Sequence, residues 1–425
     1  MATEQDKPEL SPVWARDDAF PEAPSGWGWV DAKGKIHPCD SPEKLTEAIR
    51  TDRDGSVNLV WTPQKPRMIL PEELPGMGDA LRTARERWTR DDLEDAKHKL
   101  RWFGTACVGF GTWAFYQGYL LSGQTPAGFS ERLKFAAKTI LSSGQSGLAL
   151  LMFLIFAFIP WYQARKRRRE LGAWNDARIA ATVPAMRFET WLEWQKAPMT
   201  KVLLVLMAAV GLAQLLCHVR TSGWGSLMTV FHNWDGIAEA GLVKDRYLQG
   251  ELWRLFTAPF LHGNIVHFLM NASALVYLGR RLEVFARWPH LPMVFLFSAC
   301  AGGEASARFV AAPSVGASGG LMGWLGFLLV FETLHKSLVP MRARRRLAAG
   351  VLLTALIGLV GYRYIDNAAH AGGLVAGMLY AVIVFPKSSS TERPSSTVTD
   401  RIAGGACLFV LAASAFLAAS RIIGG

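Results

Sequence analysis

Apolar segments of about 20 residues recur along the sequence from residue 102 to its end. An α-helix of that length crosses the ~30 Å hydrocarbon core of a bilayer, and it satisfies its own backbone polar groups there. Half of the residues are hydrophobic and only 19% are charged, and the charged residues are concentrated between the apolar segments. This pattern excludes an ordinary soluble enzyme, a disordered protein and a fibrous repeat. It predicts an all-α polytopic membrane protein.

We expect nine membrane spans. Several of the segments contain many Gly and Ser residues, which favours close packing between helices. The segment 347–361 is the shortest, and the sequence leaves open whether it spans fully. The expected spans are residues 102–122, 139–161, 201–219, 261–281, 291–310, 317–334, 347–361, 368–386 and 402–422.

The Lys and Arg residues are distributed unevenly between the two sides of these segments. Most fall in loops on one side, including the basic runs 165–169 and 342–346, whereas the 220–260 loop on the other side holds few. The positive-inside rule then places the N-terminus in the cytoplasm and the 220–260 loop outside. Topology thus accounts for the net charge of +11 without a nucleic-acid partner, and the basic runs would attract anionic membrane lipids. The N-terminus lacks the pattern of a signal peptide, and we expect a multi-pass protein of a bacterial cytoplasmic (inner) membrane.

The residues before the first span contain a globular part. Trp27–Val30 leads into a turn at 31–34, residues 41–49 have a helical pattern, and residues 57–61 have a strand pattern. This order predicts a small cytosolic α+β module of β-α-β type, for which we expect a protein partner. The expected organisation is a disordered N-terminus (1–24), the α+β module (25–75), a linker helix (76–101), two extra transmembrane helices (102–161), a basic cytosolic linker (162–199), a catalytic core (200–386), and a linker with a C-terminal transmembrane helix (387–425).

Polar residues at membrane depth are costly and tend to be functional. His267 and Asn271 are four residues apart in the fourth segment, so they share one helix face. The run 316–320 (Gly-Ala-Ser-Gly-Gly) opens the sixth segment, and His370 opens the eighth. These three segments all start outside and run inward, which places their first turns at a similar depth. We therefore expect His267, Asn271, Ser318 and His370 to converge near the outer surface.

Such a convergence suits acyl transfer. A serine hydroxyl is a weak nucleophile that needs an adjacent base, and histidine is the usual one. The tetrahedral intermediate needs fixed donors for its oxyanion, and the N–H of Ser318 at a helix start is suited to this role. The side chains of His267 and Asn271 add donors. The only carboxylate expected near His370 is Asp366, one helical turn earlier, so we predict a Ser–His dyad and not a triad.

Taken together, these motifs resemble the rhomboid family of intramembrane serine proteases. The family pattern has Trp-Arg in the first outer loop, then His-x-x-x-Asn with a Leu, a Gly and a Glu on the same helix, then Gly-x-Ser-Gly, and last a His followed by Gly-Gly. All occur here in order: Trp253 and Arg254; His267 and Asn271; Leu275, Gly279 and Glu283; Gly316, Ser318 and Gly319; His370, Gly372 and Gly373. The resemblance covers residues 200–386. It implies a six-helix core, to which one C-terminal and two N-terminal spans are added.

The resemblance also implies roles for individual residues. Ser318 would be the nucleophile and His370 the general base, while His267, Asn271 and the N–H of Ala317 would join the N–H of Ser318 in the oxyanion hole. The substrates would be single-span or polytopic membrane proteins. Some family members carry a Tyr four residues after the serine, stacked on the histidine, whereas this sequence has Met322.

Each of these residues also has a purely structural interpretation. Ser318 is suited to capping a helix, His370 to bonding a backbone carbonyl, and Asn271 to joining two helices. Arg254 is suited to anchoring a lipid headgroup, and Glu283 to pairing with Arg280 and Arg281. His262 and His267 are five residues apart and do not share a helix face, and the five cysteines are scattered. We therefore expect no metal, no disulfide framework and no cofactor.

Two functions from other classes compete with proteolysis. A non-proteolytic rhomboid-like protein would bind membrane clients, but such proteins usually lack the Ser or the His. A transporter would predict inverted repeats and charged residues near mid-membrane, and we find no such repeat.

Overall fold

The computed structural model describes residues 11–53, 55–123, 128–172, 175–222, 234–362 and 365–424. The chain divides into two compact units. Unit 1 comprises residues 1–16, 188–354 and 366–425, and unit 2 comprises residues 17–187 and 355–365. We describe each unit by itself.

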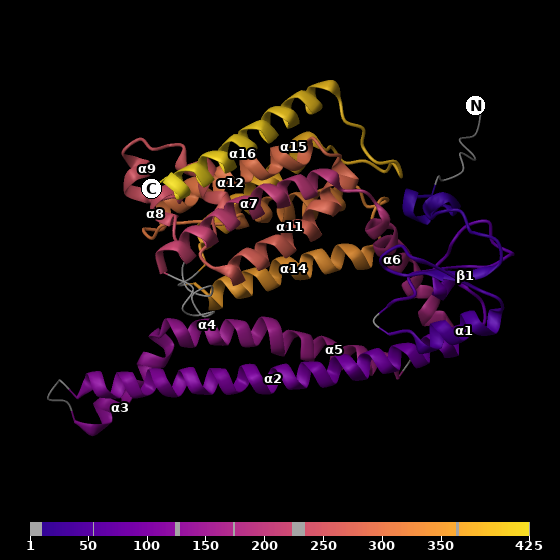
Figure 1. Cartoon of the computed structure of the whole chain (residues 1–425), viewed down its shortest axis with the longest axis horizontal. Coiled ribbons are helices and arrows are strands. Elements are labelled where there is room, and N and C mark those ends of the chain that lie inside the picture. The colour runs from indigo at the N-terminus through magenta and orange to yellow at the C-terminus, as the bar shows by residue number, and fades with distance from the viewer. Residues whose placement is uncertain are drawn as a thin grey trace, which may run out of the picture. The chain divides into compact units, whose positions relative to one another are not determined.

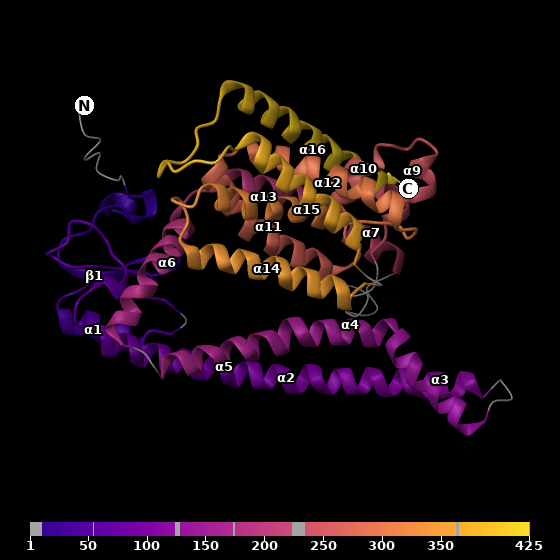
Figure 2. The same cartoon turned by 180° about the vertical axis from the view of Figure 1, so that it is seen from behind.

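Unit 1 is a bundle of apolar helices that matches the seven predicted spans after residue 200. They are α7 (Pro198–Ser222), α11 (Ile265–Ala286), α12 (His290–Phe309), α13 (Ser318–Leu334), α14 (Met341–Val360, of which residues up to 354 belong to this unit), α15 (Asn367–Val384) and α16 (Val398–Gly424). The most extensive contacts join α12, α13 and α15 to one another, and α16 packs on α7 and α12 (Figures 1 and 2).

Glycines bring α13 and α15 unusually close together. A β-carbon placed on Gly373 would lie 2.0 Å from the carbonyl oxygen of Gly319. One turn further on, a β-carbon on Gly377 would lie 1.9 Å from the carbonyl oxygen of Gly323. The two backbones are therefore in direct contact over two turns, which is the packing that small residues allow.

Between α7 and α11 the chain forms a compact outer loop of short elements. From residue 234 it contains α8 (Ile237–Ala240), α9 (Lys244–Leu248), α10 (Arg254–Thr257) and the 3-10 turn Ala258–Phe260. Leu242 forms an isolated antiparallel bridge with Ser314, in the segment before α13. This bridge attaches the loop to the start of α13.

Three helices in the described part of the chain are long and apolar enough to cross a membrane: Pro198–Thr221, Asn367–Val384 and Val398–Gly424. α13 is shorter, and α11 and α12 carry charged side chains such as Glu283 and Glu304. The protein is thus an integral membrane protein, while the count of nine spans stays a prediction.

Buried charges hold together the last turns of α11 and α13. Arg281 forms a two-bond ion pair with Glu332, with Nε to Oε1 at 2.5 Å and the terminal nitrogen to Oε2 at 2.9 Å. We had expected Glu283 to pair with Arg280 or Arg281, but in the described part of the chain it pairs with neither. Its carboxylate instead accepts hydrogen bonds from the backbone N–H groups of Met199 and Thr200 (both 2.9 Å) and from the Thr200 hydroxyl, and so caps the start of α7.

Unit 2 contains the predicted α+β module. Its sheet has the order β2-β1-β3 and is antiparallel, with β1 at Trp27–Val30, β2 at Ile36–Cys39 and β3 at Leu59–Trp61. The helix α1 (Pro42–Thr51) lies between β2 and β3 in the chain and is capped by the Ser41 hydroxyl. The predicted turn at 31–34 therefore closes a hairpin, and β2 is an additional strand that the β-α-β prediction missed.

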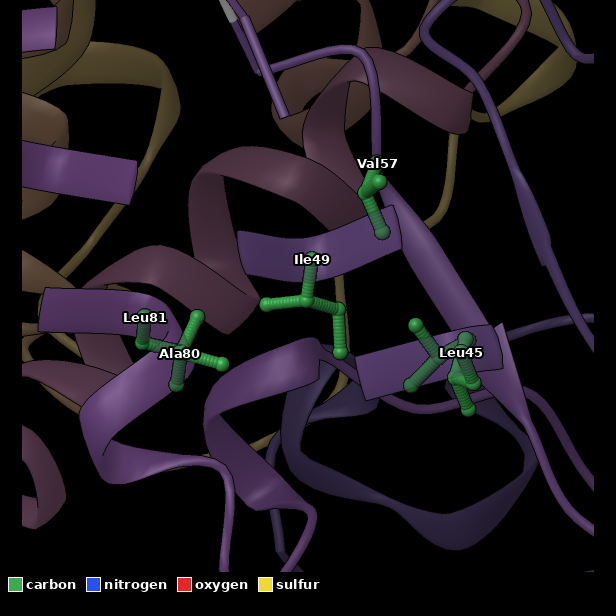
Figure 3. Close-up of a cluster of buried hydrophobic side chains, with 6 residues drawn as sticks. Leu45, Ile49, Val57, Ala80 and Leu81 are labelled. Atoms are coloured by element: carbon green, nitrogen blue, oxygen red, sulfur yellow. The ribbon is translucent and has the colours of Figure 1, made fainter. Parts of the chain in front are cut away.

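The module has a small apolar core. Leu45 and Ile49 of α1 pack with Val57, Val60, Ala80 and Leu81 (Figure 3). Val60 belongs to β3, and Ala80 and Leu81 belong to α2, so the core joins the sheet to the helix that follows it. Within the tail expected to be disordered (1–24), Val13–Ala15 and Asp17–Ala19 form 3-10 turns and Phe20 is buried.

The two extra N-terminal spans take an unexpected form. The predicted linker helix (76–101) and the first span (102–122) are one continuous helix, α2 (Gly78–Ser122). The second span (139–161) is divided among α3 (Phe129–Ser142), α4 (Gly144–Phe153), a π-helical turn (Leu154–Phe158) and α5 (Ile159–Leu171). α4 and α5 lie beside α2 in both views (Figures 1 and 2). α6 (Asp176–Trp194) then leads into unit 1.

Candidate active site

Three of the predicted site residues, Ser318, His370 and His267, lie in the first turns of three helices. Ser318 is the first residue of α13, and Ala317 is its N-cap. His370 lies in the first turn of α15, where its N–H donates to the carbonyl of Asp366 at 3.1 Å. His267 lies in the first turn of α11, where its N–H donates to the Asn264 side chain at 3.0 Å.

The structure brings these helix starts together around Gly316. A β-carbon on Gly316 would lie 2.8 Å from Nε2 of His267 and 3.4 Å from Nδ2 of Asn271. Gly316 also has a φ of +121°, a conformation that favours glycine. The segment before Ser318 thus lies directly against His267 and Asn271, and no larger residue fits between them.

His370 and Ser318 lie on the two helices that the glycines hold together. The contact of Gly373 with Gly319 is one residue from Ser318 and one turn from His370. Within the described residues, no hydrogen bond joins the Ser318 hydroxyl to His370.

A small cavity of about 30 Å³ opens beside the serine, lined in part by Ser318, Gly319, Gly316, Gly303 and Ala369. A cavity of this size holds about one water molecule. Asn271 is buried next to this region, and its Nδ2 has no hydrogen-bond partner among the described residues. This nitrogen is a donor that a group bound beside Gly316 would satisfy.

His262 supports His267 from behind. It is fully buried, and its ring packs edge-on against His267 at 5.1 Å and against Phe268 at 5.3 Å. Its backbone is fixed by Gln214, which accepts from the His262 N–H at 2.8 Å and donates to the His262 carbonyl at 3.1 Å. From the sequence we considered His262 only as a metal ligand together with His267, and rejected that interpretation. The sequence did not indicate its packing role.

Arg254 is not a headgroup anchor, because it is 1% exposed. Its guanidinium donates to the carbonyls of Ala238 (3.0 Å) and Gly241 (2.8 Å), and its Nε lies 2.5 Å from Glu251. It also lies over the Trp253 ring at 4.6 Å. The Trp-Arg motif therefore folds the outer loop onto itself.

A buried polar network that the sequence did not reveal ends next to His370. Lys244 of the outer loop donates to the Ser306 hydroxyl at 2.6 Å, and the hydroxyls of Ser306 and Ser314 both donate to Asp366. The other oxygen of Asp366 accepts from the Ala369 N–H at 2.9 Å and caps α15. Neither Lys244 nor either serine belongs to a motif in the sequence.

The protonation of this network is set by its environment. Burial lowers the pKa of Lys244 to about 8, and the nearby Asp366 opposes that shift. Burial would raise the pKa of Asp366, but its hydrogen bonds from Ser306, Ser314 and Ala369 hold the pKa below its usual value. Asp366 is therefore a carboxylate at neutral pH, one turn from His370.

Comparison with known proteins agrees with this geometry. Residues 249–387 match the rhomboid domain family. The chain is 34% identical to RHOMBOID-like protein 6, mitochondrial, of Arabidopsis thaliana, over 42% of this chain and 60% of that protein. It is 32% identical to rhomboid protease GluP of Bacillus subtilis, over 33% of this chain and 28% of that protein. It is 33% identical to inactive rhomboid protein 2 of Homo sapiens, over 32% of this chain and 16% of that protein.

These matches cover less than two thirds of each relative's own length. The family match starts at residue 249, later than the resemblance we had drawn from residue 200, and leaves α7 outside it. All of the predicted site residues fall within the match. Residues 249–387 of this chain therefore form a rhomboid domain.

Proposed function

We propose that the protein is an intramembrane serine endopeptidase that cleaves peptide bonds in or near the transmembrane segments of other membrane proteins. The observation that carries the proposal is the close packing around Ser318: Gly316 lies against His267 and Asn271, and the helix that begins with Ser318 touches the helix of His370 at Gly319 and Gly373. The relationship to a protein named as a protease, GluP of Bacillus subtilis, supports it.

In the proposed reaction, the Ser318 hydroxyl attacks the carbonyl carbon of the scissile bond while His370 takes the hydroxyl proton. The carbonyl oxygen becomes an oxyanion. The N–H groups of Ala317 and Ser318 and the side chains of His267 and Asn271 are the donors proposed to stabilise it. His370 then protonates the leaving amine. Water enters from the outer side, His370 accepts its proton, and the acyl-enzyme is hydrolysed.

The proposed dyad requires Ser318 and His370 to form a hydrogen bond during the reaction. Catalytic hydrogen bonds are often long or poorly aligned in a free enzyme and tighten when substrate binds. The backbone contact between α13 and α15 supports the proposal, because it keeps the two residues on facing helices at the same depth. Met322 stands where some relatives place a stacking tyrosine, so the His370 ring is proposed to be held mainly by its own helix.

We further propose that the protein lies in a bacterial inner membrane, with the α+β module in the cytoplasm. The distribution of Lys and Arg residues supports this orientation. The module is proposed to bind a protein partner, because it has its own core and is not needed to build the site. Deleting residues 1–77 without any change in partners, localisation or activity would contradict this role.

A second candidate function is client binding without proteolysis. Two observations favour it: inactive rhomboid proteins are among the relatives, and Ser318 and His370 are not hydrogen-bonded to each other. The presence of both residues argues for the protease.

Cleavage of a single-span substrate in reconstituted membranes separates the two functions. Wild type is compared with Ser318→Ala and His370→Ala, and a fluorophosphonate probe reports the reactivity of Ser318. Cleavage and labelling that both variants lose would support the protease. A folded wild-type protein that neither cleaves nor labels would favour client binding.

A further inference from the structure

Unit 1 contains a second, larger cavity at the opposite end of the bundle from Ser318. It has a volume of about 720 Å³ and lies among the start of α7, the end of α11 and the segment that enters α16. Four cationic side chains line it: Lys196, Arg287, Arg393 and Arg401. None of the four belongs to the proposed catalytic machinery.

The acidic groups near this cavity are already engaged elsewhere. Glu283, the one acid that lines it, accepts three hydrogen bonds at the start of α7. Glu392 pairs with Arg16, and Asp400 accepts from the N–H and hydroxyl of Thr397 (2.7 and 2.8 Å) and lies 3.9 Å from His290. Among the described residues, no carboxylate forms an ion pair with any of the four cations.

Two of the four cations are held in place by backbone carbonyls. Arg287 Nε donates to the carbonyl of Pro394 at 3.1 Å, and Arg393 donates to the carbonyl of Val284 at 3.3 Å. These two bonds join the end of α11 to the segment before α16 and keep the two guanidinium groups together. Burial and the neighbouring charge of Arg287 lower the pKa of Arg393, which reflects positive charge that the protein does not fully compensate.

Arg287 also has an unusual backbone. Its φ is +69°, and it is the only non-glycine residue with a positive φ in the described chain. L-residues rarely adopt this conformation, and it persists only where the surroundings impose it. A glycine would adopt this backbone conformation more readily than an arginine. The position nevertheless carries an arginine, and that residue lines the cavity.

One wall of the cavity is apolar. Met199, Val202, Val284 and Trp288 line it beside the cations. Val202 is 40% exposed on α7, a helix apolar enough to cross a membrane. An occupant that satisfies both parts of the cavity has an anionic end and a hydrocarbon end.

We propose that this cavity binds an acidic phospholipid, whose phosphate contacts Arg287, Arg393 and Arg401 and whose acyl chain lies along α7. Guanidinium groups bind phosphate oxygens through paired hydrogen bonds, and Arg is well suited to a partly buried site of this kind. The predicted topology places the cavity on the cytoplasmic side, where membranes present anionic headgroups. The phosphate chemistry is shared with free inorganic phosphate, and the apolar wall favours the lipid.

Native mass spectrometry of the full-length protein in neutral detergent tests the proposal, with phosphatidylglycerol as the probe and phosphatidylcholine for comparison. We expect phosphatidylglycerol to bind selectively and to resist displacement by millimolar inorganic phosphate. Arg287→Gly removes the cation and relieves the backbone, and Arg401→Gln removes a second cation from another element. Each should weaken binding about fivefold, since one basic residue near a membrane surface contributes on the order of 1 kcal/mol.

The matched control is Arg342→Gln, which removes one exposed charge from α14 on the same predicted side but outside the cavity. It should leave binding unchanged. Equal affinity in wild type, Arg287→Gly and Arg401→Gln would overturn the proposal, as would an equal loss in Arg342→Gln. Displacement by inorganic phosphate would assign the site to the free anion and overturn the lipid assignment. Because Ser318 labelling is measured separately, failure here would not bear on the proposed protease.

Discussion

The carbonyl oxygen of Gly319 lies 2.0 Å from the point where Gly373 would carry a β-carbon. The oxygen belongs to the backbone and a β-carbon is bonded directly to it, so neither atom is able to move without shifting a helix. This contact holds α13 against α15 one residue from Ser318 and one turn from His370. The geometry of the candidate site therefore depends on the absence of a methyl group.

Gly373→Ala should separate these helices and destabilise the protein by about 1–3 kcal/mol or more, the usual cost of overpacking. We expect a lower Tm in detergent and lost cleavage. Gly405→Ala in α16 is the matched control, because a β-carbon there meets nothing within 4 Å. It should leave Tm unchanged or slightly raised. Equal Tm values for the two variants would show that α13 and α15 are not in contact.

Glu332→Gln should be strongly destabilising, by about 3–5 kcal/mol, because it leaves the buried Arg281 charge without its main partner. The double variant Arg281→Met, Glu332→Leu removes both charges and should recover most of that loss. A double-mutant cycle on Tm or on the free energy of unfolding measures the coupling. Arg280→Gln, beside the pair but hydrogen-bonded only to the Glu193 carbonyl, is the control. A single variant no worse than this control would contradict the buried pair.

The stability of the protein should depend on pH through Lys244. Its pKa is about 8 in the folded chain, against a usual value of 10.5, so the folded chain binds fewer protons between these two values. The penalty of burying the charge is fully present below about pH 8 and is lost as pH rises toward 10.5. The Tm of wild type should therefore rise relative to that of Lys244→Met over this range. Lys336→Met, an exposed lysine, should show no such trend. A constant difference between wild type and Lys244→Met would mean that Lys244 titrates normally.

Asn271→Ala should lower kcat while leaving KM and Tm nearly unchanged, if Asn271 donates to the oxyanion. Removal of one such donor lowers kcat by about 10²–10³-fold in a serine protease. Ser273→Ala, an exposed residue on the same helix whose hydroxyl bonds only the Leu269 carbonyl, is the control. A fall in Tm that matches the fall in kcat would instead assign Asn271 a purely structural role.

Much of the architecture was predictable because it follows from local properties of the chain. Hydropathy located helices at the spans from 201–219 onward, and their many Gly and Ser residues predicted close packing between helices. The predicted segments of His267, Ser318 and His370 start on the same side of the membrane, and from this we expected the three residues to lie close together. The N-terminal part was less predictable. α2 continues through both a polar linker and an apolar segment, and β2 follows a turn whose partner strand has no clear apolar alternation.

The sequence by itself determined that this chain is a membrane protein with a rhomboid domain and which residues are candidates for chemistry, because hydropathy and motif order are carried by residues close together in the chain. Only the tertiary structure decided which distant groups meet. Lys244 reaches Ser306 across 62 positions, and Arg281 reaches Glu332 across 51. Arg254 and Glu283 found backbone partners that no motif specifies. Buried polar groups must be paired, but the choice of partner depends on which helix ends and loops the packing brings together, and that is a property of the folded bundle alone.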